Sequence, residues 1–186
     1  MLETELKCII DERTYIRLSE LFKWDWIKEQ VNSYYTDSKN ELKRNGITFR
    51  IREKDSAKKI QIKTHKGPAG PLQICEEQEY DTDTIPESFG ADEVKKLTGI
   101  SADVFLLGSL TTLRHSLMFC DGVEICLDKN DYLDKTDYEI EIEYTKPIPK
   151  ELTELLNSEG VEFTERSVGK CSRFMIRLAA IMKGEL

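Results

Sequence analysis

The sequence has few of the residues on which the commonest catalytic and metal sites depend. It holds only two histidines, His65 and His115, in 186 residues. This excludes an H-E-x-x-H motif and a zinc site of three histidines, and it leaves little scope for a Ser/His/Asp triad. We expect both histidines to be surface or core residues. Any hydrolysis would therefore depend on carboxylates, basic side chains and metal.

The sequence also lacks the signs of disulfides, of membrane spans and of a secretory signal. The five cysteines are an odd number, lie far apart and show no C-x-x-C spacing, which is typical of reduced thiols. No stretch approaches the roughly 18 apolar residues of a membrane span. Glu3 and Glu5 stand where a signal peptide would be basic. We expect a cytoplasmic protein with no membrane partner.

An excess of basic residues is absent as well. The net charge is -8, which argues against a nucleic-acid partner, because phosphate-backbone binding needs a basic surface. An anion site inside a cavity stays open, since a few buried cations can outweigh a distant acidic surface. The length fits one domain, or one domain plus a small helical appendage. We expect a single domain over residues 1–186, as a monomer or homodimer.

What the sequence does contain is alternation of polar and apolar residues, the pattern of strands. Asp11 and Gly160 mark helix boundaries, and Trp24–Trp26 is interpreted as a linker. Polar loops are expected over 66–71 and 131–137. The strands are expected over 2–10, 29–36, 47–53, 58–64 and up to about 80, and around Leu113, Ile125 and Ile140. Helices are expected over 12–23, within 82–100, and over 149–157 and 167–182. The order predicts an α+β chain dominated by antiparallel sheet.

Several of these strands carry charges of one sign on one face. Glu139, Glu141 and Glu143 share a face, as do Arg50 and Arg52, while the opposite faces are apolar. A solvated outer face is the plain interpretation of any single strand. Uniform acid on one strand and uniform base on another favours charged faces that meet across a gap. A closed eight-stranded sheet has room inside for side chains or one small ligand, so the pattern is compatible with a charged tunnel.

The motifs in this order resemble the CYTH, or triphosphate tunnel metalloenzyme, family. Glu3-x-Glu5-x-Lys7 is similar to its E-x-E-x-K signature, and further similar segments span nearly the whole chain. They are Phe49-Arg50-Ile51-Arg52, Gln61-Ile62-Lys63, an acidic strand with Glu77 or Glu79, Leu110 to Arg114, Leu127-Asp128-Lys129, Tyr138 to Glu141, and Gly169 to Phe174 with its K-x-S-R-F pattern. The family includes class IV adenylate cyclase, thiamine triphosphatase and inorganic triphosphatases.

The resemblance implies a closed eight-stranded antiparallel β-barrel with flanking helices, and a triphosphate bound inside it with Mg2+ or Mn2+. Glu5, Lys7 and Lys170 would be catalytic. The implied metal ligands are Glu3, Glu5, Asp128, Glu139 and Glu141. The implied phosphate-binding residues are Lys7, Arg50, Arg52, Lys63, Arg114, Lys170 and Arg173, of which Arg173 fits a salt bridge near the helix start equally well. The candidate tunnel-lining acids are Glu77, Glu79 and Glu143, with an even choice between the first two.

Three functions remain open at this point. The first is hydrolysis of inorganic triphosphate or an organic triphosphate such as thiamine triphosphate. The second is cyclisation of ATP, for which no adenine pocket is visible in the sequence. The third is a non-catalytic module that binds polyphosphate or a phosphorylated ligand, and the presence of both acidic pairs argues against it.

Overall fold

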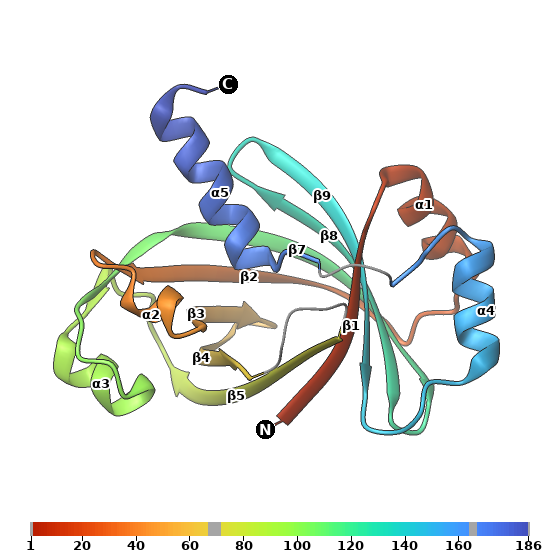
Figure 1. The fold of residues 1–186 in the computed structure, drawn as a ribbon, viewed down its shortest axis with the longest axis horizontal. Helices are drawn as coiled ribbons and strands as arrows, with labels where there is room; N and C mark the ends of the chain where they lie inside the picture. The colour runs from red at the N-terminus through yellow and green to blue at the C-terminus, as the bar shows by residue number, and fades with distance from the viewer. Residues whose placement is uncertain (1, 67–71, 164–166, 186) are drawn as a thin grey trace.

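The computed structural model describes residues 2–66, 72–163 and 167–185, and nine strands within them form one antiparallel sheet (Figure 1). The order β2-β3-β4-β5-β1-β9-β8-β7 closes on itself, because β2 also pairs with β7. The predicted eight-stranded barrel is thereby confirmed, and the two-residue β6 adds to the edge of β7. The strands are β1 (Leu2–Ile10), β2 (Trp26–Asp37), β3 (Ile47–Lys54), β4 (Ala57–His65), β5 (Leu72–Thr82), β6 (Ser88–Phe89), β7 (Val104–Cys120), β8 (Val123–Tyr132) and β9 (Lys135–Tyr144).

Five helices flank the barrel in the described part of the chain. They are α1 (Glu12–Leu21), α2 (Glu41–Arg44), α3 (Ala91–Thr98), α4 (Lys150–Ser158) and α5 (Lys170–Lys183). Asp11 caps α1 as expected, because its carboxylate accepts a hydrogen bond from the Thr14 amide at 2.7 Å. None of the helices in the described ranges has the length and apolar character needed to cross a bilayer.

The apolar faces of the strands point outward, and helices cover them. One cluster joins the outer faces of β8 and β9, including Ile125 and Ile140, to Leu18 of α1 and Leu152 of α4. A second cluster on β2, β3 and β4 packs on α2 and α3, which lie on the other side of the barrel (Figure 1). This arrangement leaves the interior to the charged faces.

Several element boundaries differ from the sequence prediction. The stretch 131–137 is not a polar loop: β8 runs to Tyr132 and β9 begins at Lys135, with Leu133 at a positive φ of 53° in the turn. β7 is a strand of 17 residues, far longer than its centre at Leu113 indicates, and Trp26 belongs to β2. Long cross-strand pairing outweighs the local polar composition here. The terminal helix begins at Lys170 and not at residue 167. Most of the predicted loop 66–71 lies outside the described residues.

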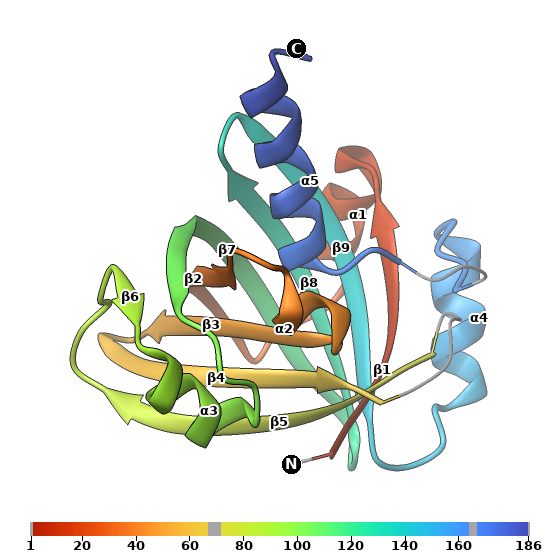
Figure 2. The ribbon, with the colours of Figure 1, turned by 60° about the vertical axis from the view of Figure 1, so that its left-hand side comes forward.

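The first turns of α5 cover one end of the barrel (Figure 2). Phe174 packs in a buried cluster with Tyr34, Leu110 and Tyr132, which project from β2, β7 and β8. Gly108 on β7 makes this approach possible, since it adopts a φ of +141°. A Cβ there would lie 3.0 Å from the tip of the Phe174 ring.

We expect Gly108→Ala to lower the free energy of unfolding by about 1–3 kcal/mol, because it strains the backbone and presses on Phe174. Gly90→Ala is the matched control, since Gly90 has a φ of -74° and nothing within 4 Å of its added Cβ. It should change stability by less than about 0.5 kcal/mol. Urea unfolding of both variants checks this, and equal stability of the two would contradict the proposed close packing.

Candidate active site

The barrel interior holds a cavity of about 290 Å³ whose wall is dominated by ionised side chains. Alternation along the strands turns these side chains inward while their neighbours enter the outer clusters. The charged lining residues are Lys7, Arg50, Arg52, Lys63, Arg114 and Lys170, together with Glu3, Glu5, Glu77, Glu141 and Glu143. Such a mixture suits a ligand that carries both an anion and a cation.

The structure brings together all but one of the predicted phosphate-binding residues. Those from Lys7 to Lys170 line the cavity, whereas Arg173 does not. The Arg173 guanidinium instead pairs with Asp137 at 2.8 Å and with Glu139 at 2.8 Å. The salt-bridge alternative therefore describes its position, away from the other six candidate phosphate-binding residues.

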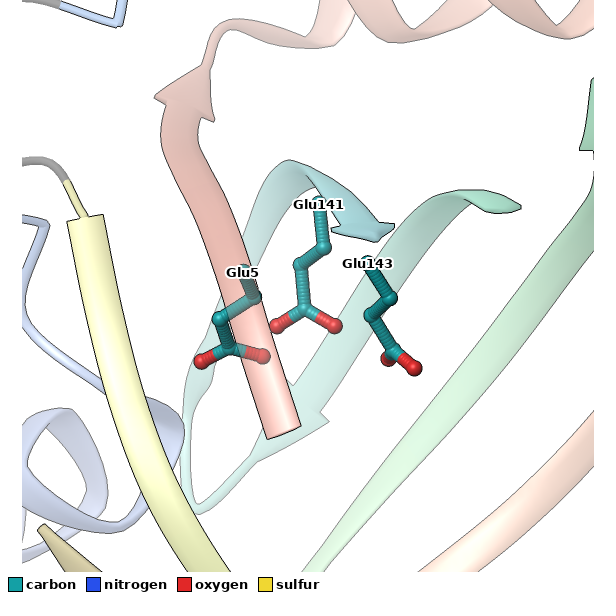
Figure 3. A group of neighbouring side chains, drawn as sticks. All are labelled: Glu5, Glu141 and Glu143. Carbon is teal, nitrogen blue, oxygen red and sulfur yellow. The ribbon is translucent and has the colours of Figure 1, made fainter. Parts of the chain in front are cut away.

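The predicted metal ligands divide into two layers. Glu5 and Glu141 line the cavity, and with Glu143 they offer carboxylate oxygens that lie within 4.8 Å of one another (Figure 3). Asp128 and Glu139 are fully buried outside the cavity lining, where they form a second acidic group with Glu141. The second layer holds basic side chains in place.

The remaining predicted acids also find distinct places. Glu3 lines the cavity and pairs with Lys63 at 2.6 Å. Glu77 lines the cavity, whereas Glu79 is exposed and is bound by Lys59 and Gln61, which resolves the choice between the two.

Lys7 is buried between two of the cavity carboxylates. Its ammonium lies 3.2 Å from Glu5 and 2.8 Å from Glu141. Burial alone would raise the pKa of Glu5 and Glu141, but Lys7 and the cations near it together hold both below their ordinary values. Lys63 and Lys170 assist Lys7 at Glu5, and Arg114 assists it at Glu141. The same contacts hold the pKa of Lys7 above its ordinary value against the effect of burial. All three groups are therefore ionised at neutral pH.

Arg114 and Lys170 connect the two acidic layers. Arg114 binds Asp128 with two hydrogen bonds, at 2.9 and 2.7 Å, and reaches Glu141 at 2.5 Å. The Lys170 ammonium lies 2.8 Å from Asp128 and 3.0 Å from Glu141, and it also donates to Glu139. Lys170 is the ionised residue that α5 contributes to the cavity lining, beside Cys171 and Ser172.

Arg52 lacks an anionic partner among the described residues. Its only hydrogen bond in that part of the chain runs from Nε to Asn32 at 3.0 Å, and no carboxylate lies within 4.0 Å. Burial, with Arg50 and Arg114 nearby, lowers its pKa to about 10. Arg50 donates from Nε to Gln61 at 2.7 Å, and the Glu77 carboxylate lies 3.6 Å from its Nη2. This part of the cavity is short of negative charge.

Tyr34 is a cavity residue that none of the sequence motifs includes. Its side chain is fully buried, and its hydroxyl has no hydrogen-bond partner within the described residues. Burial raises its pKa to about 12, so the phenol stays protonated and can donate. Tyr34 lies directly opposite Arg50 in the pairing of β2 with β3, so the two side chains share a face of the sheet. This pairing with a predicted cavity residue was the signal that could have placed Tyr34 inside the barrel. Other unpredicted lining residues are Thr48, His65, Gln73 and the segment 167–169 with Cys171 and Ser172.

A family model described as the CYTH domain matches residues 1–167. The chain belongs to the CYTH domain family. Enzymes of this family depend on a metal ion and include triphosphatases and cyclases. Among curated proteins, none matches this sequence.

Solved structures share the CYTH barrel. A Bacillus halodurans protein assigned as an adenylate cyclase is 26% identical, with a TM-score of 0.70 over 92% of this chain and 96% of its own. HpAC1 from Hippeastrum, an assigned adenylyl cyclase described as having a dominant triphosphatase activity, is 19% identical, with a TM-score of 0.72 over 99% and 97%. A mimivirus capping-enzyme triphosphatase is 14% identical, with a TM-score of 0.52 over 84% and 87%. The last two likenesses concern the fold.

The carboxylates of this CYTH domain fit a hard divalent cation. Mg2+ and Mn2+ prefer oxygen ligands, and the acidic cluster offers carboxylate oxygens from two neighbouring strands. Glu143 is placed to join Glu5 and Glu141 as a ligand, since it lies directly opposite Glu5 in the pairing of β1 with β9. Its place in the cavity wall agrees with the tunnel-lining position expected for it.

Glu143 gives a pH-dependent test of this cluster. Burial, with Glu141, Glu3 and Glu5 nearby, raises its pKa from 4.5 to about 7, although Arg114 opposes the shift. A pKa that is higher in the folded state gives stability that is complete below about pH 4.5 and is lost as the pH rises through about 7. We expect Glu143→Gln to raise the free energy of unfolding by about 1–3 kcal/mol at pH 8, and to change it little at pH 4.5.

If Glu143 is a metal ligand, bound metal should act in the opposite direction and stabilise the unsubstituted protein more than the Glu143→Gln variant. At pH 8, Mn2+ should raise the unfolding temperature of the unsubstituted protein more than that of Glu143→Gln, because only the carboxylate binds the ion strongly. Thermal unfolding with and without Mn2+ measures both effects. An equal response of the two proteins would show that Glu143 is not a metal ligand.

Proposed function

We propose that this CYTH domain hydrolyses a triphosphate with the help of a divalent metal ion, Mg2+ or Mn2+. The substrate would be inorganic triphosphate or an organic triphosphate such as thiamine triphosphate. The observation that carries the proposal is the Arg52 guanidinium in the cavity wall, close to Arg50 and Arg114. It has no anionic partner among the described residues. Guanidinium groups bind phosphate oxygens in bidentate fashion, so a phosphate chain would supply the missing negative charge.

The basic and acidic residues are arranged for such a ligand. Arg50 and Arg52 project from β3, whereas Glu141 and Glu143 project from β9. β3 and β9 are separated by three strands in either direction around the ring, so they face each other across the barrel. A phosphate chain on one wall would thus lie opposite a cation on the other.

Residues of this chain can be given roles in phosphoryl transfer. When bound, a divalent cation supplies charge neutralisation at phosphate oxygens and lowers the pKa of water. Arg50, Arg52, Lys63 and Lys7 would bind and orient the chain, and Lys170 would stabilise the charge that moves to the leaving phosphate. Catalysis of phosphoryl transfer rests mainly on such positioning and electrostatics. No histidine is required.

Hydrolysis is favoured over cyclisation of ATP by the cavity lining. Cyclisation requires a pocket that holds the adenine and aims the ribose hydroxyl. Among the described lining residues, Tyr34, His65, Val168 and Cys171 are the apolar or aromatic ones, and they are outnumbered by ionised groups. HpAC1, which is described as having a dominant triphosphatase activity, points the same way by analogy.

The test is an activity panel with purified protein, Mg2+ or Mn2+, and inorganic triphosphate, thiamine triphosphate or ATP. Metal-dependent release of orthophosphate supports the proposal. Pyrophosphate together with cyclic AMP would establish a cyclase instead. Binding without turnover of any of the three compounds would indicate a non-catalytic module.

We expect Glu5→Gln to reduce kcat at least about a hundredfold, a loss of about 2.7 kcal/mol of transition-state stabilisation, because a neutral amide is a poor ligand for Mg2+. Glu76→Gln is the matched control on a neighbouring strand, where Glu76 is partly exposed and pairs with Lys66. Circular dichroism should show both variants folded. Unchanged turnover by folded Glu5→Gln would refute the role of Glu5 as a metal ligand.

Lys7→Ala should mainly weaken substrate binding. A hydrogen bond to a charged group contributes about 1.5–3 kcal/mol, so KM for the triphosphate should rise about 10- to 100-fold. Steady-state kinetics with a circular dichroism spectrum measures this. A protein that no longer folds would instead assign Lys7 a structural role.

A further inference from the structure

Arg173 occupies a position that phosphate binding does not explain. It follows Lys170 by three residues on α5, so both side chains lie on the same side of the helix. The two diverge at their ends: Lys170 reaches the cavity, whereas Arg173 is directed to Asp137 on β9. Nε and Nη2 of Arg173 donate to the two Asp137 oxygens at 2.8 and 3.0 Å.

Asp137 is itself held by the barrel wall. Tyr132 donates its hydroxyl to Asp137 at 2.6 Å, and Asn130 donates its amide at 3.2 Å. Asn130 accepts a hydrogen bond from Thr112 on β7 at 2.8 Å. Asp137 is thus fixed by groups from two further strands, and the network is buried. A fully satisfied buried network of this kind holds its members in one arrangement.

The other bonds of Arg173 fix the start of the helix. Nη1 donates to the carbonyl of Val168, the second residue before α5, and contacts Glu139 at 2.8 Å. Glu139 also accepts from Lys170. Arg173 therefore contacts three parts of the structure: the segment before α5 at Val168, the barrel wall at Asp137, and Glu139, which also binds Lys170.

The other contacts of the first turns of α5 are mainly apolar. Lys170 and Phe174 are its buried residues, and Cys171, Met175 and Leu178 are partly buried against the Phe174 cluster. Ile176 and Met182 are 62% and 81% exposed. The position of the Lys170 ammonium thus depends on the first turn of the helix, and Arg173 is the polar anchor of that turn. Losing such an anchor would let Lys170 leave Asp128 and Glu141.

We propose that Arg173 is a positioning residue that fixes α5 on Asp137 and thereby keeps Lys170 at the cavity. This rests on the proposed function for its effect on turnover, but not for its effect on the helix. The residue would touch no phosphate. Asp137, which no motif singled out, becomes the second member of this pair.

The first experiment follows the helix without using activity. Cys171 on α5 is partly buried, and burial raises its pKa to about 11, so it should react slowly with iodoacetamide. We expect Arg173→Lys and Asp137→Asn each to speed alkylation of Cys171 about tenfold, by exposing it through opening of the helix. Peptide mass spectrometry separates Cys171 from the other cysteines.

The matched control is the Arg177–Asp134 pair one turn further along α5. It has the same two-bond geometry, at 2.8 and 2.6 Å, but it is more exposed and lies beyond Lys170. Asp134→Asn should leave the labelling of Cys171 and the turnover unchanged. Tyr132→Phe removes only one hydrogen bond to Asp137 and serves as the milder variant if Asp137→Asn does not fold. It should still speed the labelling measurably.

The second experiment is a double-mutant cycle on turnover of inorganic triphosphate with Mn2+. Arg173→Lys and Asp137→Asn should each lower kcat/KM about tenfold, as is usual for residues that orient a site, and the double variant should be no worse than either. If Asp137→Asn alters neither labelling nor kcat/KM while Arg173→Lys raises KM, Arg173 binds phosphate and the proposal is wrong. Multiplicative losses in the double variant would also overturn it. Absence of turnover in the unsubstituted protein refutes the proposed function alone, because the labelling still tests Arg173.

Discussion

The structure depends on neutralisation of charge inside a closed barrel. An unpaired charge removed from water costs several kcal/mol, and the interior holds Lys7, Glu5 and Glu141 almost entirely shielded from solvent. Each of them is tolerated because its neighbours carry the opposite sign, at separations of 2.8 to 3.2 Å. Removal of any one leaves its partners buried and uncompensated, so these residues have to be considered as a set.

A charged interior means that the apolar core must lie elsewhere. Ile125, Leu127 and Ile140 face outward and are covered by α1 and α4, and a second cluster lies under α2 and α3. The helices therefore supply the apolar partner surface that a barrel normally finds inside itself. α5 differs, since it places one phenylalanine against the end of the barrel and carries a lysine to the cavity.

Sequence alternation separated a charged face from an apolar face on the strands, and the family resemblance indicated that the charged faces turn inward in a closed barrel. The position of each side chain along the barrel axis was not predictable. Alternation places Glu139, Glu141 and Glu143 on one face, but it does not say which residues of the neighbouring strands lie opposite them. The register of β9 against β1 and β8 sets Glu143 opposite Glu5 and Glu139 opposite Asp128. Asp137 was assigned to a loop, so a partner for Arg173 on the wall could not be foreseen.

The separation of the two walls has a consequence for binding. Arg50 and Arg52 have little negative charge close to them. On the other wall, the carboxylates of Glu5, Glu141 and Glu143 lie together and bring an excess of negative charge to the surroundings of Lys7. A cation added to the acidic wall would leave the cavity more positive, and a phosphate chain added to the basic wall would leave it more negative. Each would therefore strengthen the binding of the other, and by linkage the two effects are equal. Under the proposed function, a cavity built in this way would favour the metal and the triphosphate bound together over either ion alone.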